Sequence, residues 1–125
     1  MRNLLILICV GTMLFSCQGG IDLKGFDSAS WKGDRHGCEA YRSSIYKDIV
    51  EQREQVLGKT IREVNGYFGN PNITELARKD QKYYLYQVTK DSTCQGFDSD
   101  TKQIYLRLRF SAVGIVNEVT LDIKN

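Results

Sequence analysis

Four cysteines and one histidine are the residues of this 125-residue chain that could ligate a metal, form disulfides or act as nucleophiles. Cys9 lies inside an apolar run and Cys17 ends it, which leaves Cys38 and Cys94 as a pair. A metal or redox pair is the alternative to a disulfide, but the chain has no C-x-x-C spacing and only His36 as a nitrogen ligand. The sequence therefore predicts a Cys38–Cys94 disulfide, and no metal or cofactor.

The start of the chain has the layout of a secretory signal. Arg2 supplies a positive charge, and the apolar run from Leu4 to Phe15 is well short of the roughly twenty residues that span a bilayer. Leu14-Phe15-Ser16-Cys17 resembles the bacterial lipobox, in which cleavage leaves the cysteine as a lipid-bearing first residue. We expect residues 1–16 to be a lipoprotein signal peptide and Cys17 to be the lipidation site. Residues 17–33 are predicted to form a lipidated tether and an irregular lead-in, with Phe26 and Trp31 packed against the domain.

The predicted location is the bacterial outer membrane, with the protein facing the periplasm. The glycine-rich residues after Cys17 include no acidic cluster of the kind that resembles a surface-export signal. An exported chain also suits a disulfide. Seventeen basic residues against fifteen acidic ones give a mixed surface, which offers no electrostatic case for nucleic-acid binding.

Two helices are expected before the first strand. From Glu39 to Leu57, apolar residues recur at helical spacing, and polar residues that include Arg42 occupy the solvent side. Thr60 and Glu63 form the pattern of a capping box, which predicts a second helix ending at Gly69. Its buried residues are expected to be Ile61, Val64, Tyr67 and Phe68.

Four segments have strand character: residues 73–78, 82–88, 103–110 and 115–123. The alternation of the last two fixes the parity of their pairing, because a one-residue slip would exchange the two faces. The expected inner pairs are Ile104–Ile123, Leu106–Leu121, Leu108–Val119 and Phe110–Asn117, and the outer pairs are Tyr105–Asp122, Arg107–Thr120 and Arg109–Glu118.

These elements predict an α+β fold in the order ααβββ(β). Two N-terminal helices would pack on one face of a three- to four-stranded antiparallel sheet, within a single domain over residues 34–125. The opposite face would present Tyr105, Arg107 and Arg109 to a partner, with Tyr84 and Tyr86 as contributors, since tyrosine and arginine are enriched at interfaces. The alternative is a solvated face carrying weak Arg109–Glu118 contacts.

Two blocks of sequence resemble the BamE (SmpA/OmlA) group of small outer-membrane lipoproteins. The first is Gly58-x-Thr60-x-x-x-Val64-x-x-Tyr67-Phe68-Gly69-x-Pro71, and the second is Leu106-x-Leu108-x-Phe110-x-x-x-Gly114-x-Val116. The resemblance implies a domain similar to one repeat of β-lactamase-inhibitor protein, and a non-catalytic role in outer-membrane assembly. The Trp31 segment, the Cys38/Cys94 pair and the tyrosine-rich strand depart from the family pattern.

The sequence thus favours a membrane-anchored, non-catalytic lipoprotein that binds or scaffolds an envelope protein in outer-membrane assembly or integrity, with no small-molecule substrate evident. A second hypothesis is a periplasmic inhibitor of a hydrolase that presents the long Lys90–Lys102 loop. An enzyme is the third hypothesis, and it would place Asp34 and His36 in one site. No catalytic residues are predicted, because no nucleophile arrangement or phosphate-binding loop is present.

Overall fold

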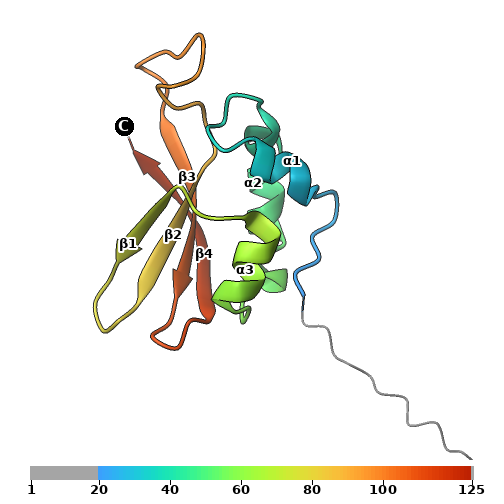
Figure 1. Ribbon diagram of the computed structural model, residues 1–125, viewed down its shortest axis with the longest axis vertical. Coiled ribbons are helices and arrows are strands. Elements are labelled where there is room, and N and C mark those ends of the chain that lie inside the picture. Colours follow the sequence, from blue (N-terminus) through green and yellow to red (C-terminus); the bar gives the residue numbers. More distant parts are fainter. Residues whose placement is uncertain (1–19, 125) are drawn as a thin grey trace, which may run out of the picture.

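The computed structural model describes residues 20–124, in which a helical layer covers one face of an antiparallel sheet (Figure 1). The helices come first: α1 (Ser28–Gly33), α2 (Tyr41–Glu51), a 3-10 turn at Arg53–Gln55, and α3 (Ile61–Phe68). The strands follow as β1 (Ile73–Leu76), β2 (Lys82–Gln87), β3 (Gln103–Phe110) and β4 (Val116–Lys124), adjacent in that order. The predicted α+β class is confirmed.

The pairing of β3 with β4 follows the predicted parity along most of its length. Six of the predicted pairs are present, from Ile104–Ile123 to Arg109–Glu118. The predicted Phe110–Asn117 pair is wrong, because the register shifts between Arg109 and Phe110 and places Val116 opposite Phe110. The shift lets the apolar Val116 point into the core while Asn117 stays exposed.

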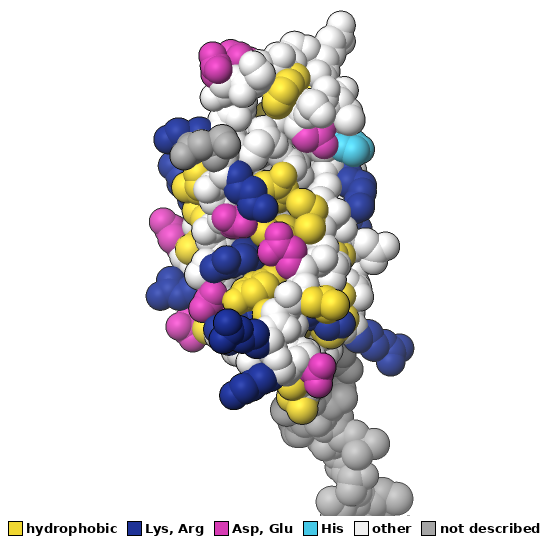
Figure 2. All heavy atoms as spheres, turned by 90° about the vertical axis from the view of Figure 1, so that its left-hand side faces the viewer, with side chains coloured by type: hydrophobic (Ala, Val, Ile, Leu, Met, Phe, Trp, Pro, Cys, Tyr) yellow, Lys and Arg dark blue, Asp and Glu magenta, His cyan; other side chains and the backbone are white. Residues whose placement is uncertain are grey.

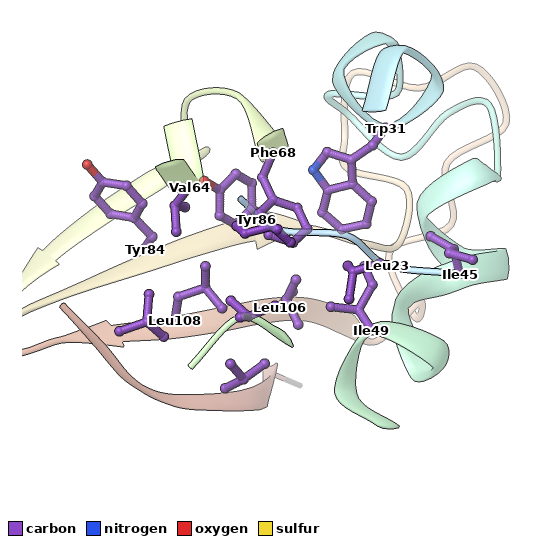
Figure 3. Packing of buried hydrophobic residues seen from close by; sticks show 14 of the residues in the cluster. Leu23, Trp31, Ile45, Ile49, Val64, Phe68, Tyr84, Tyr86, Leu106 and Leu108 are labelled. Atoms are coloured by element: carbon purple, nitrogen blue, oxygen red, sulfur yellow. The ribbon is translucent and has the colours of Figure 1, made fainter. Parts of the chain in front are cut away.

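Aromatic side chains fill the junction between the two layers. Figure 3 shows Trp31 of α1, Phe68 of α3 and Tyr86 of β2 packed together. The ring centroids are 5.7 Å apart for Trp31 and Phe68, and 5.8 Å apart for Phe68 and Tyr86. Full burial of a side chain of this size is worth about 1.5–3 kcal/mol, so these three residues are major contributors to stability.

The core begins earlier in the chain than the predicted domain boundary at residue 34. Ile21 and Leu23 are buried in the same cluster as Trp31, and the backbone N–H of Leu23 donates to the Tyr67 hydroxyl. The lead-in also contains α1, which the sequence does not predict, and whose first turn is capped by the Asp27 carboxylate. The segment after residue 20 is therefore part of the packed domain and not an irregular lead-in.

Side-chain and backbone hydrogen bonds both fix the start of α3. Thr60 and Glu63 form the predicted capping box, with the Thr60 side chain accepting from the Glu63 N–H. The chain just before the helix also pairs with the start of β4, because the N–H groups of Gly58 and Ile61 donate to the carbonyls of Val116 and Gly114. This pairing attaches the helical layer to the sheet through backbone hydrogen bonds.

Arg42 corrects the predicted solvent side of α2, since it is only 1% exposed. Its Nε donates to the Trp31 carbonyl, and its Nη1 donates to Asn72 Oδ1 and to the Gln87 carbonyl. Desolvation lowers the pKa of Arg42 to about 10, so the guanidinium stays charged at neutral pH. A buried cation with this many acceptors joins α1, α2 and β2 at one point.

Candidate functional site

The predicted contact residues of β3 lie on the sheet face that points away from the helices. Tyr105, Arg107 and Arg109 are half-buried there, and they alternate with three buried apolar residues of the same strand. Figure 2 shows this side of the molecule, where basic and acidic side chains surround hydrophobic ones. Across the face, Lys124 Nζ of β4 lies 3.7 Å from Glu75 Oε1 of β1.

Arg107 is held in place by three neighbours. Its Nε donates to Thr120 Oγ1 at 3.2 Å, its Nη2 lies 3.5 Å from Glu118 Oε1, and its guanidinium carbon lies 4.9 Å from the centroid of the Tyr83 ring. The predicted alternative, in which Glu118 contacts Arg109, is therefore wrong. Arg109 faces Glu118 in register, but the carboxylate pairs with Arg107 instead.

Arg109 has a neutral partner and lies beside a hollow. Its Nε donates to Gln81 Oε1 at 2.7 Å, and its Nη2 donates to the same oxygen. The hollow has a volume of about 420 Å³ and is lined by Arg109, Gln81, Tyr83 and three residues at the start of the β1–β2 turn, Ala77, Arg78 and Lys79. Within residues 20–124, no carboxylate lies within ion-pair distance of its three cations.

Sequence reasoning missed this hollow, although its residues carry a signal. Arg78-Lys79-Asp80 is a run of charged residues between two strands, which marks a turn without showing which way the turn folds. Lys79 and Asp80 both have positive φ, and the Gln81 N–H donates to the Arg78 carbonyl. This geometry is that of a type I′ turn, and it places Arg78 and Lys79 beside Arg109.

Tyr84 and Tyr86 do not belong to this face, and their prediction as contact residues is wrong. They lie opposite Leu108 and Leu106 in register, so they point toward the helices. Tyr86 is fully buried and donates its hydroxyl to the Gly69 carbonyl, and Tyr84 is 8% exposed. Strand parity places Tyr83, and not Tyr84 or Tyr86, on the face that carries Arg107.

Comparisons of the chain with protein-family models, curated proteins and solved structures find no match. The resemblance to the BamE group therefore stays a prediction.

The predicted disulfide is present, with the Cα atoms of Cys38 and Cys94 5.4 Å apart. It ties the chain before α2 to the Lys90–Lys102 loop, which protrudes at the top of Figure 1. Next to it, His36 Nδ1 lies 2.7 Å from Asp91 Oδ2. Partial burial acts to raise the pKa of Asp91, but hydrogen bonds from Thr93 and His36 hold it below its ordinary value. The imidazole and the disulfide thus fasten the same loop.

Asp34 lines the same small hollow as His36, but the two side chains have different hydrogen-bond partners. Its carboxylate accepts from the backbone N–H groups of Glu39 and Arg42, at 2.8 and 2.9 Å. It therefore caps the first turn of α2, a role that the N-cap residue Ala40 cannot fill because it has no side-chain acceptor. The carboxylate partner of His36 is Asp91, which lies 55 residues further along the chain.

The described part of the chain contains no helix that is long and apolar enough to cross a membrane, and no group of three or more His, Cys, Asp or Glu side chains placed to hold a metal ion. The predicted signal peptide and the lipidation site Cys17 lie outside the described residues.

Proposed function

We propose that this protein is a lipid-anchored, non-catalytic binding module of the bacterial envelope, held at the periplasmic side of the outer membrane. The observation that carries the proposal is the distance in sequence between its anchor motif and its folded core. The lipobox-like motif ends at Cys17, and Ile21 is already buried in the hydrophobic cluster.

This spacing would hold the domain against the membrane surface. Four residue steps separate Cys17 from Ile21, and a fully extended chain covers at most about 3.6 Å per residue, which gives roughly 14 Å. Leu23 and Lys24 are fastened to the domain through the side chains of Tyr67 and Gln52, so the chain cannot lengthen by unwinding there at no cost. A domain confined in this way meets other membrane-bound proteins at a raised effective concentration.

A binding role is also supported by the outer face of the sheet. Arg107 is fixed by Thr120, Glu118 and the ring of Tyr83, so it would lose little conformational entropy on binding. Arg109 adds a cation without a carboxylate partner among residues 20–124. Fixed arginines next to a tyrosine are typical of protein interfaces.

The proposal is tested by mass spectrometry of the mature protein isolated from its own membranes. We expect an acylated N-terminal Cys17, and we expect Cys17→Ser to release the protein from the membrane fraction. Cys9→Ser is the matched control, since Cys9 lies in the segment that cleavage would remove. An unmodified first residue in the wild-type protein would contradict the proposal.

A hydrolase inhibitor is the second candidate, and the loop of residues 90–102 favours it. The loop is mostly exposed, yet it is fixed by the disulfide and by internal hydrogen bonds such as Thr93 N–H to Asp91 Oδ1. A rigid exposed loop loses little entropy when it enters an active-site cleft. Inhibition of periplasmic hydrolases by the isolated protein, abolished by changes in this loop alone, would establish this role.

A further inference from the structure

The hollow at Arg78, Lys79 and Arg109 lies at one end of an open sheet edge. Strand β1 is the outermost strand of the described sheet, where it pairs only with β2, and all four of its residues are exposed. Leu76, the last of them, is 85% exposed. An unpaired sheet edge and a cluster of cations are therefore adjacent in this fold.

The unpaired backbone groups of the edge can be assigned from the hydrogen-bond pattern. The N–H of Ala77 donates to the Gln81 carbonyl, which makes these two residues a hydrogen-bonded pair. Such pairs alternate along an antiparallel ladder, so Glu75 and Ile73 also face β2. The N–H and C=O groups of Thr74 and Leu76 therefore point away from the sheet. They are free to receive another strand.

No carboxylate among residues 20–124 neutralises the cations of the hollow. Arg109 donates to the neutral oxygen of Gln81, whereas Arg107 on the same strand has Glu118. Asp80 follows Lys79 in the turn, but among residues 20–124 it forms no ion pair with the hollow. An arriving carboxylate would meet three positive charges without displacing an existing acidic partner.

We propose that β1 and this hollow together bind an extended, acidic segment of a partner protein, which adds to the sheet as a fifth strand. Backbone groups of Thr74 and Leu76 would bind the main chain of the segment, and the hollow would bind its carboxylates. A peptide satisfies both features, whereas an isolated anion satisfies only the hollow. An acidic extended segment is thus the class of partner for the proposed binding module. That the segment belongs to an envelope protein rests on the proposed function.

The probe is a short acetylated peptide in which glutamate alternates with threonine and valine. Its binding to the purified protein is measured by fluorescence anisotropy and by NMR shifts of backbone amides. We expect saturable binding with the largest shifts at Thr74, Leu76 and the residues of the hollow. The same peptide with lysine in place of glutamate is expected not to bind.

Three variants separate the contributions. Arg109→Gln and Lys79→Asn are each expected to lower the affinity for the glutamate peptide about fivefold. Asparagine is chosen at position 79 because it tolerates the positive φ there. Thr74→Pro removes an edge N–H that no strand of the described sheet uses, and it is expected to abolish binding while β1 stays paired. Arg53→Gln is the matched control, because Arg53 is an exposed arginine of the helical layer and not of the outer sheet face, and it should change affinity less than about twofold.

Several outcomes would overturn the inference. One is a peptide that shifts no amide of β1, and another is equal affinity for the Thr74→Pro and wild-type proteins. A third is binding to anionic phospholipid vesicles, and not to the peptide, that depends on Arg109 and Lys79. The peptide assay measures binding and not membrane attachment. A failed peptide titration therefore leaves the lipid-anchor test at Cys17 unaffected, and the two failures can be told apart.

Discussion

The guanidinium of Arg42 lies 4.6 Å from the centroid of the Trp31 ring and donates to the carbonyl of the same residue. Arg42 also donates to Asn72 Oδ1, which in turn accepts from the backbone N–H of Gln87. One buried cation thus connects the N-terminal helix, the turn before β1 and the end of β2.

Replacing Arg42 with methionine is expected to lower the free energy of unfolding by about 3 kcal/mol. The side chain keeps a similar length, but the Trp31 and Gln87 carbonyls lose a charged donor in a buried setting. Denaturant unfolding measures the loss. Arg53→Met is the control, because Arg53 is exposed, and a change within about 0.5 kcal/mol is expected there. Equal losses in both variants would contradict the structural role of Arg42.

Gly37→Ala is expected to destabilise the protein by about 2 kcal/mol or more. Gly37 has a φ of +75°, and an added Cβ would collide with the carbonyl of Thr89. Gly33→Ala is the comparison, since nothing lies within 4 Å of a Cβ at that helical position and alanine favours a helix. In thermal unfolding, the midpoint temperature of Gly37→Ala should therefore lie below that of the wild type, and that of Gly33→Ala should lie at or above it. The reverse order would contradict the close approach of residue 37 to the backbone of Thr89.

Removing the disulfide with Cys38→Ser and Cys94→Ser is expected to lower the free energy of unfolding by about 4 kcal/mol at most. The bridge closes a loop with a sequence separation of 56 residues, and the chain-entropy model gives that upper figure. Amide hydrogen exchange should increase most in the loop of residues 90–102. The reduced wild-type protein should behave like the double variant, and an unchanged stability in both would show that the loop is held by its other contacts.

Asp91→Asn is expected to destabilise the protein at neutral pH and to matter less in acid. The pKa of Asp91 is lowered in the folded state, so its contribution is complete above the unfolded value of about 3.8 and is lost as the pH falls through the folded value. Unfolding curves of the two proteins at pH 7 and at about pH 3 measure this difference. A difference that grows on acidification would contradict the assignment.

The sequence was most informative where local rules and packing agree. Thr60 and Glu63 define a helix start by their spacing, and the alternation in β3 sets most of the β3–β4 register. Both depend on residues close together in the chain or on a strict two-residue period, which a sequence displays directly.

The parts that sequence reasoning missed depend on contacts between distant segments. Arg42 is buried because Asn72 and Gln87 supply acceptors 30 and 45 residues away. Strand β2 carries tyrosines on both of its faces, and only its register with β3 shows that Tyr84 and Tyr86 point toward the helices. The hollow beside Arg109 depends on positive φ values at both Lys79 and Asp80, and lysine gives no sequence signal of that conformation.

The pairing of the chain before α3 with the start of β4 has a consequence for how the protein is made. The N–H groups of Gly58 and Ile61 donate to the carbonyls of Val116 and Gly114, which are synthesised well after the helices. A growing polypeptide that lacks its final strand therefore leaves this junction open to solvent. The junction between the helical layer and the sheet can therefore form only after β4 has been synthesised.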